Sequence, residues 1–165
     1  MKKAFTLVEL LVVIAIMSIL TTIAVSQFQT AKRKANDVAR KGDLNAVAKA
    51  LQMYYADYGR MPEASVDGKI MVVADSPISW GGEFKDAASY IYMKQLPIEN
   101  NEGLPPYCYK TDGKAYALFA MLENTQDSQC ISGATYRCGD PVANYEYCFA
   151  YYSPNIGLNN DGSFK

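Results

Sequence analysis

A long apolar run near the N-terminus constrains this 165-residue chain more than any other feature. The run covers the 21 residues from Phe5 to Val25 and contains a single charged residue, Glu9. As a helix it would span about 30 Å, which matches the hydrocarbon core of a bilayer. Lys2 and Lys3 lie just before the apolar run, at its N-terminal end. The N-terminus is therefore expected in the cytoplasm and the bulk of the chain outside. The sequence thus predicts a single-pass membrane protein.

A cleaved secretory signal peptide is the alternative explanation of this run. Such a peptide ends in a small-residue pattern of the A-x-A type, which Thr22-Ile23-Ala24 fits poorly, although Ala24 and Ser26 leave it open. Glu9 argues against it more strongly, because a carboxylate inside an apolar run costs about 2–3 kcal/mol on insertion. Unless it only lies near the membrane interface, Glu9 therefore needs a purpose.

The residues around Glu9 suggest that purpose. The stretch Ala4-Phe5-Thr6-Leu7-Val8-Glu9, behind a short basic leader, resembles the processing motif of type IV prepilins and type II secretion pseudopilins. The resemblance implies that a prepilin peptidase cleaves between Ala4 and Phe5 and that the new N-terminus at Phe5 is methylated. Family members usually carry Gly where this chain has Ala4, another small residue.

Cleavage would leave the amine of Phe5 as a cation in apolar surroundings. An unpaired charge there costs several kcal/mol, so the Glu9 carboxylate of one subunit is expected to pair with the Phe5 amine of its neighbour. The resemblance further implies a homopolymer that is built on an inner-membrane assembly platform. The subunit would first be held in membrane lipid and would then join an extracellular filament at the cell surface.

The expected domains follow from this interpretation. They are a leader (residues 1–4), a transmembrane and filament-core helix (5–28), the outer half of that helix (29–58) and a globular β-rich head (59–165). The outer half repeats apolar residues at helical spacing and ends at Tyr58-Gly59 with Pro62 beyond, a typical stop signal. The residues expected to face the head are Leu44, Val47, Leu51, Tyr54 and Tyr58.

A basic cluster on the outer half of the helix allows three interpretations. It comprises Lys32-Arg33-Lys34 and Arg40-Lys41, offset by Asp37 and Asp43. It could bind nucleic acid or anionic lipid headgroups, or it could be a solvated face with local ion pairs such as Lys34 with Asp37. The solvated face is favoured, since no aromatic platform accompanies the charges.

The head is expected to be an antiparallel sheet, which with the helix gives an α+β fold of the type IV pilin kind. Three segments are candidate strands, and a fourth, Asp86–Met93, is a candidate short helix. Thr111-Asp112-Gly113-Lys114 is a hairpin turn signal. Phrases such as Asp57-Tyr58-Gly59-Arg60-Met61-Pro62 resemble the body of major pseudopilins and pilins. The candidate strands are Tyr107–Lys110, Ala115–Leu122 and Tyr145–Tyr152.

Four cysteines in the last third of the chain indicate two disulfides formed outside the cytoplasm. Three pairings are possible. We favour Cys130–Cys138, which closes a short loop, with Cys108–Cys148, which would join the first and last strands. The absence of a C-x2-C pair argues against zinc.

No cofactor is expected, with one exception to consider. Major pseudopilins bind calcium through a C-terminal loop, and the stretch Asn159–Ser163 offers oxygen ligands, chiefly from Asn159 and Asp161. The alternative is a flexible polar tail.

The sequence does not favour an enzyme. It contains no histidine, which removes the commonest general base and metal ligand. It therefore predicts a structural subunit of a filament for adhesion, motility, DNA uptake or secretion. The alternatives are a secretion pseudopilin acting as a short periplasmic piston, or a minor tip pilin that binds a ligand.

Overall fold

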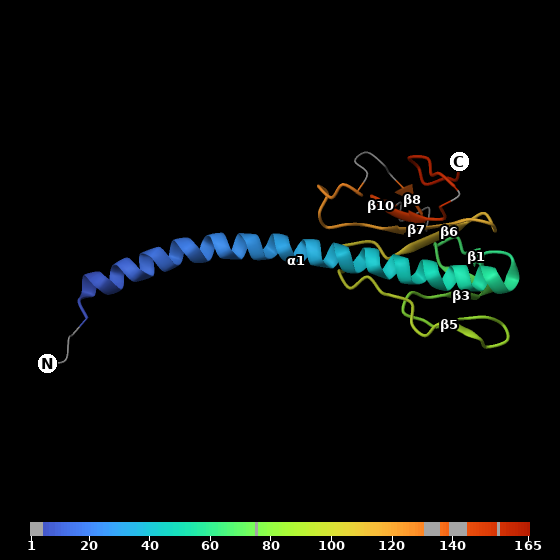
Figure 1. Ribbon diagram of the computed structural model, residues 1–165, viewed down its shortest axis with the longest axis horizontal. Coiled ribbons are helices and arrows are strands. Elements are labelled where there is room, and N and C mark those ends of the chain that lie inside the picture. Colours follow the sequence, from blue (N-terminus) through green and yellow to red (C-terminus); the bar gives the residue numbers. More distant parts are fainter. Residues whose placement is uncertain (1–4, 75, 131–135, 139–144, 155) are drawn as a thin grey trace. The chain divides into compact units, whose positions relative to one another are not determined.

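The computed structural model describes residues 5–74, 76–130, 136–138, 145–154 and 156–165. They belong to two compact units, one reaching to Asn36 and one formed by Asp37–Lys165. A single helix, α1 (Leu7–Tyr58), contributes to both units (Figure 1). The predicted long helix is confirmed to within two residues at either end.

The end of α1 has the predicted stop signal. Gly59 has a φ of 65°, the left-handed conformation that glycine adopts without strain, and its N–H donates to the Tyr55 carbonyl at 2.8 Å. Pro62 follows and cannot continue a helix. Local sequence chemistry thus decides where the helix stops.

The main sheet of the second unit has the strand order β10-β7-β6 and is antiparallel. Two of its strands match predicted ones, and β6 and β7 pair from Cys108 with Phe119 to Thr111 with Tyr116. The third predicted strand, Tyr145–Tyr152, is divided: Phe149–Tyr152 joins this sheet as β10, whereas Glu146–Tyr147 belongs to a separate sheet. The Asp-Gly turn between them is confirmed, with Gly113 at a φ of 89°. The strands are β6 (Cys108–Thr111), β7 (Tyr116–Ala120) and β10 (Phe149–Tyr152).

The rest of the second unit consists of short antiparallel pairings. The predicted helix over Asp86–Met93 is wrong, because this stretch lies in the hairpin β4-β5. Asp86 accepts the Tyr90 N–H at 2.8 Å and Ser89 has a φ of 68°, so the chain reverses before it completes a helical turn. The strands are β1 (Glu63–Ala64), β2 (Ile70–Val73), β3 (Ser76–Ile78), β4 (Phe84–Lys85), β5 (Ile91–Met93), β8 (Tyr136–Arg137) and β9 (Glu146–Tyr147).

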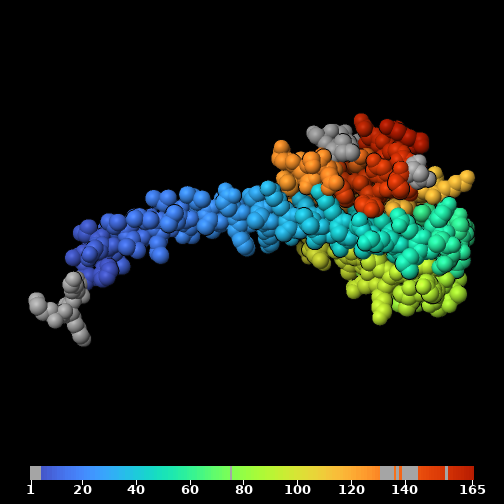
Figure 2. Space-filling view, in the orientation of Figure 1, coloured from blue at the N-terminus to red at the C-terminus, as the bar shows by residue number. Residues whose placement is uncertain are grey.

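The core of the second unit lies between α1 and the main sheet. Figure 1 shows this sheet along one side of the second part of α1 and β5 on the other, and Figure 2 shows the same arrangement with side chains filled in. The predicted helix face is confirmed for Leu44, Val47, Leu51 and Tyr54, which are buried. Tyr58 differs: it stacks on Tyr54 but its side chain stays exposed.

Residues of β7 alternate between two apolar clusters, as side chains of a strand must. Leu118 and Ala120 face the cluster that contains the α1 residues, whereas Ala117 and Phe119 face a smaller cluster. The sheet is therefore apolar on both faces, and each face has its own covering.

This alternation corrects the predicted disulfides. The bonds join Cys108 to Cys138 and Cys130 to Cys148, so both predicted pairs are wrong. Cys108 and Cys138 lie in the smaller cluster, whereas Cys130 and Cys148 lie in the cluster on the α1 side. A bond between Cys108 and Cys148 would have to pass through the sheet.

A glycine supports the Cys108–Cys138 bond. Gly68 has a φ of 74°, its carbonyl accepts the Tyr109 N–H at 2.8 Å, and a Cβ there would lie 2.0 Å from the Cys108 sulfur. The loop before β2 thus comes so close to the disulfide that no side chain fits.

Candidate functional site

The N-terminal end of α1 carries the residues that the sequence singled out. Ala4 lies outside the described residues. Phe5 directly precedes the helix, its side chain is 80% exposed, and Glu9 lies in the first helical turn. Cleavage at Ala4, methylation at Phe5 and the pairing of Glu9 with a neighbour all stay predictions.

Thr6 and Glu9 form a reciprocal cap at this helix end. Glu9 Oε2 accepts the Thr6 N–H at 2.8 Å and the Thr6 hydroxyl at 2.7 Å, while the Glu9 N–H donates to Thr6 Oγ1 at 3.3 Å. This is a capping box, which satisfies N–H groups that lack partners at a helix start. No hydrogen bond reaches Glu9 Oε1 from the described residues, so this oxygen is left to accept from another molecule.

This cap was not predicted from the sequence, although its signal was present. Thr6-Leu7-Val8-Glu9 has the T-x-x-E spacing that places a capping hydroxyl and a carboxylate three residues apart. The carboxylate therefore has a local partner in a single subunit. If Glu9 also pairs with a neighbouring molecule, it does so either through Oε1, which Thr6 leaves free of hydrogen bonds, or by giving up its hydrogen bonds with Thr6.

The surface of residues 5–35 is unusual, because every one of them is exposed although most are apolar. Among the described residues, α1 is the one helix long and apolar enough to cross a membrane. An exposed apolar surface of this extent marks a site that a membrane or another protein covers.

Three hydroxyl groups in the middle of this segment donate hydrogen bonds within the helix itself. Ser18 donates to the Ile14 carbonyl and Thr21 to the Met17 carbonyl, each at 2.7 Å. Thr22 donates to the Ile19 carbonyl at 2.7 Å. Because a bilayer offers no water, polar groups in it must find partners inside the protein. These hydroxyls are therefore compatible with a membrane environment.

The predicted basic cluster divides in two. Lys32, Arg33 and Lys34 are exposed, and their side chains make no ion pair or hydrogen bond with other described residues. Arg40, in contrast, is buried, and Lys41 is half-buried, so the interpretation of all five as one solvated face is wrong. The suggested Lys34–Asp37 pair is absent too, because Asp37 pairs with Arg40 at 2.8 Å.

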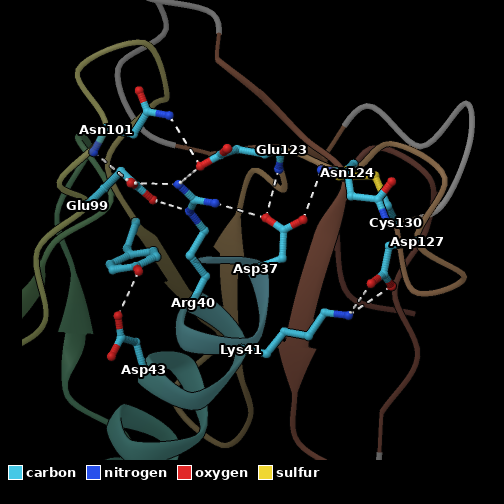
Figure 3. A network of polar contacts seen from close by, with 12 residues as sticks. Asp37, Arg40, Lys41, Asp43, Glu99, Asn101, Glu123, Asn124, Asp127 and Cys130 are labelled. Carbon is cyan, nitrogen blue, oxygen red and sulfur yellow. Dashed lines mark hydrogen bonds and ion pairs between the residues drawn. A yellow bond between two sulfur atoms is a disulfide. The ribbon is translucent and has the colours of Figure 1, made fainter. Parts of the chain in front are cut away.

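Arg40 is the centre of a buried network in the second unit (Figure 3). Its guanidinium contacts Asp37 at 2.8 Å, Glu99 at 2.6 Å and Glu123 at 2.8 Å, with side-chain exposures of 2–16% for the three carboxylates. Asp37 also accepts the N–H groups of Glu123 and Asn124, at 2.8 and 2.9 Å. One arginine thus joins α1 to two distant segments.

Two neighbouring contacts extend the network along α1 (Figure 3). Lys41 Nζ contacts Asp127 at 2.8 Å, and this hydrogen bond lowers the pKa of Asp127. Tyr107 donates to Asp43 at 2.8 Å, and burial together with that bond raises the pKa of Tyr107. Sequence spacing cannot reveal these contacts, because their partners lie 64 to 86 residues apart.

The proposed calcium ligands lie in a tight hairpin near the C-terminus. Asp161 Oδ1 accepts the Ser163 N–H at 3.0 Å, and the Asn159 side chain donates to the Ser163 hydroxyl at 2.8 Å. Gly162 is buried, and a Cβ there would lie 3.3 Å from the Phe119 ring. The segment is thus folded onto the second unit, and calcium binding stays a prediction.

The described part of the chain contains no group of three or more Cys, Asp or Glu side chains arranged to hold a metal ion. The carboxylates around Arg40 are already engaged by its guanidinium.

Comparison with known proteins gives a consistent result. Residues 1–25 match the family model of the prokaryotic N-terminal methylation motif. The type II secretion system core protein G of Pseudomonas aeruginosa is 31% identical over 102 residues, which cover 59% of this chain and 67% of that protein. No solved structure is a significant match.

Two pilus proteins are also similar. The type IV major pilin protein PilE1 of Neisseria gonorrhoeae is 27% identical over 154 residues, 86% of this chain and 72% of that protein. The type IV wide pilus major component PilA4 of Thermus thermophilus is 42% identical over 55 residues, and the chain spans only 42% of its length. The likeness is thus densest in a short segment and extends thinly over most of the chain.

Proposed function

Because the chain belongs to the family of type IV pilins and type II secretion pseudopilins, it is a structural filament subunit, and we propose that it builds a pilus at the cell surface. The observation that carries the proposal is the exposed apolar face of residues 5–35 with one carboxylate at its start. A membrane covers such a face before assembly, and the helices of other copies cover it afterwards.

Processing creates the assembly-competent N-terminus in this proposal. A prepilin peptidase removes residues 1–4, and methylation leaves the Phe5 amine charged. Glu9 Oε2 is held by Thr6, while Oε1 remains to accept from the Phe5 amine of a neighbouring subunit. Since that cation is costly without a partner in apolar surroundings, the pairing sets the axial position of one subunit against the next.

A filament subunit that starts in the membrane also needs a partner there that assembles it. The inner-membrane assembly platform would receive the membrane-held subunit. No catalytic role is proposed, because the relatives are named as pilins and secretion components and the chain lacks histidine.

A second candidate function is that of a type II secretion pseudopilin, a subunit of a short periplasmic filament. The identity of 31% with the core protein G favours it. The similarity to PilE1 favours the pilus, because it covers 86% of this chain.

The test is to shear surface fibres from cells that produce the chain and to examine them by electron microscopy and intact mass spectrometry. Long fibres whose subunit begins at methylated Phe5 support the pilus. Processed subunits found only in the cell envelope support the pseudopilin, and chains that begin at Met1 in a fibre contradict the proposed processing.

A further inference from the structure

The basic triplet Lys32-Arg33-Lys34 lies on an exposed part of α1, and its side chains form no ion pair or hydrogen bond with other described residues. The two cations that follow it differ, because Arg40 pairs with buried carboxylates and Lys41 pairs with Asp127. An anionic group outside the subunit would therefore stabilise the triplet.

The position of the triplet opposes the expected orientation of the chain. Cations close to a membrane span are enriched on its cytoplasmic side, and they direct the orientation of the span. Only Lys2 and Lys3 precede the apolar run Phe5–Val25, whereas the three cations of the triplet follow it within nine residues. The outer side thus carries more cationic side chains than the cytoplasmic side, and the proposed processing would remove Lys2 and Lys3 altogether. A feature that works against insertion needs a use on the outer side.

The charges on either side of the apolar run bracket a stretch of membrane length. Between Glu9 and Lys32 the chain has 22 uncharged residues, Leu10–Ala31, which as a helix span about 33 Å. The hydrocarbon core of a bilayer is about 30 Å thick. If this stretch spans the core, the triplet lies in the outer headgroup layer and Glu9 at the opposite boundary. That placement takes the carboxylate out of the hydrocarbon, where a charge costs more than an uncharged polar group.

Uncharged polar residues occupy the outer end of this stretch. Gln27 and Gln29 precede Lys32 by about 8 Å or less along the helix, so both lie close to the headgroup layer in this placement. The Thr30 hydroxyl donates to the Ser26 carbonyl at 3.3 Å and thus has a partner within the helix. The end of the stretch that leads to the triplet therefore suits the boundary between hydrocarbon and headgroups.

The three cations point in different directions from the helix. Successive residues of an α-helix are rotated by about 100°, so the triplet covers about 200° of the circumference. A folded partner docks on one side of a helix and meets only part of such a set, whereas lipid headgroups surround a helix that crosses a membrane. The arrangement therefore favours a lipid surface over a second copy of the chain or a nucleic acid.

We propose that the basic triplet binds the anionic phospholipid headgroups of the outer leaflet while the subunit is held in the membrane. The inference rests on the proposed function, in which a membrane holds the subunit before assembly, and it names the lipid class that the subunit binds there. Each Lys or Arg near an anionic surface strengthens binding by about fivefold. Because the triplet lies in the headgroup layer and is reached by ions from the solvent, salt weakens the contact.

The first experiment measures lipid preference by native mass spectrometry of the full chain, released from detergent that contains equal amounts of phosphatidylglycerol and phosphatidylcholine. The test variant carries Lys32→Gln, Arg33→Gln and Lys34→Gln, since Gln preserves helix propensity. A matched control removes three exposed lysines of the second unit by Lys49→Gln, Lys94→Gln and Lys114→Gln. We expect the unchanged chain and the control to retain phosphatidylglycerol preferentially, and the test variant to lose at least tenfold of that preference.

An equal preference in the test variant and the control would overturn the inference, because the anionic lipid would then bind elsewhere on the chain. A further variant, with Lys32→Arg, Arg33→Lys and Lys34→Arg, keeps the charge of the triplet and should keep the preference. If this variant loses the preference as well, charge is not its cause and the inference fails.

The second experiment identifies the partner in cells that produce the chain. A photoreactive amino acid replaces the exposed Ala31, which leaves all three cations in place. We expect cross-links from the membrane-held subunit to lipids, with a larger anionic fraction than in the membrane as a whole, and the excess should vanish when the triplet is changed to Gln. Cross-links confined to nucleic acid or to another copy, or to lipid without an anionic excess, would overturn the inference. An absence of filaments from the unchanged chain would overturn the proposed pilus and leave the lipid contact standing.

Discussion

The N-terminal segment, residues 5–36, and the second unit, Asp37–Lys165, satisfy their side chains in opposite ways. The second unit buries its apolar residues in two clusters and surrounds its buried arginine with carboxylates. The N-terminal segment exposes its apolar residues, and the charged side chain of Glu9 is hydrogen-bonded only to the nearby Thr6 among the described residues. The second unit has what it needs to fold as a single chain, whereas the N-terminal segment needs a membrane or other copies. Mutations in the two regions should accordingly change different measurements.

The largest effect is expected for Glu9→Val, which removes the only carboxylate of the N-terminal segment. The neighbour's Phe5 amine then lacks a partner at a cost of several kcal/mol, so filament yield should fall by about 100-fold or more. Membrane insertion and processing should persist, because the apolar run is intact. The measurement is the amount of sheared filament relative to total processed subunit.

Thr6→Val is the control that separates the two roles of Glu9. It breaks the capping box, which costs about 1 kcal/mol, but keeps the carboxylate. Filament yield should fall much less than for Glu9→Val. If the two variants assemble equally poorly, Glu9 acts through the cap and its pairing with a neighbour is contradicted.

The second largest effect is expected for Arg40→Ala. It leaves three carboxylates of low exposure without their cation, and breaking a buried ion pair costs about 3–5 kcal/mol. The free energy of unfolding of the second unit should fall by that amount, as measured by urea titration of the detergent-solubilised chain. The control variant is Lys41→Ala, which breaks the more exposed ion pair with Asp127 and should lower the free energy of unfolding by about 1 kcal/mol or less. If Arg40→Ala lowers the free energy of unfolding no more than Lys41→Ala does, the prediction that Arg40 stabilises the buried network is contradicted.

A smaller effect is expected when one disulfide is removed. The double change Cys108→Ser and Cys138→Ser should lower the free energy of unfolding by about 2–4 kcal/mol. Membrane insertion should not change, because both cysteines lie in the smaller cluster of the second unit. Non-reducing peptide mapping of the unchanged chain should yield Cys108 with Cys138 and Cys130 with Cys148; any other pairing contradicts the separation of the two clusters by the sheet.

The smallest effect is a dependence of stability on pH that is confined to the second unit. The hydrogen bond from Lys41 lowers the folded pKa of Asp127, so this group contributes stability above its unfolded pKa of about 3.9. That contribution is lost as the pH falls through the lower folded pKa. Unfolding curves from pH 6 down to pH 2 should show the loss, and Lys41→Gln should reduce its slope. An unchanged slope in Lys41→Gln would exclude this pair as the source.

The difference between the regions also explains which predictions succeeded. The helix, its end at Tyr58 and the hairpin at Gly113 follow from contacts within a few residues, and they were predictable. The capping box was equally local and needed only attention to the T-x-x-E spacing. The stretch Asp86–Met93 was misjudged because a turn closed by Asp86 outweighs a short helical pattern.

The sequence by itself determined the family, the exposed apolar segment and the lone carboxylate at its start, because each depends on residue order along one helix. Only the tertiary structure decided which cysteines pair and which residues of the basic cluster are buried. Cys108 and Cys148 are separated by a sheet whose faces the cysteine spacing does not reveal. Arg40 is buried because Glu99 and Glu123, far away in the sequence, come together around it. Such contacts are set by how distant segments pack, which short-range patterns do not encode.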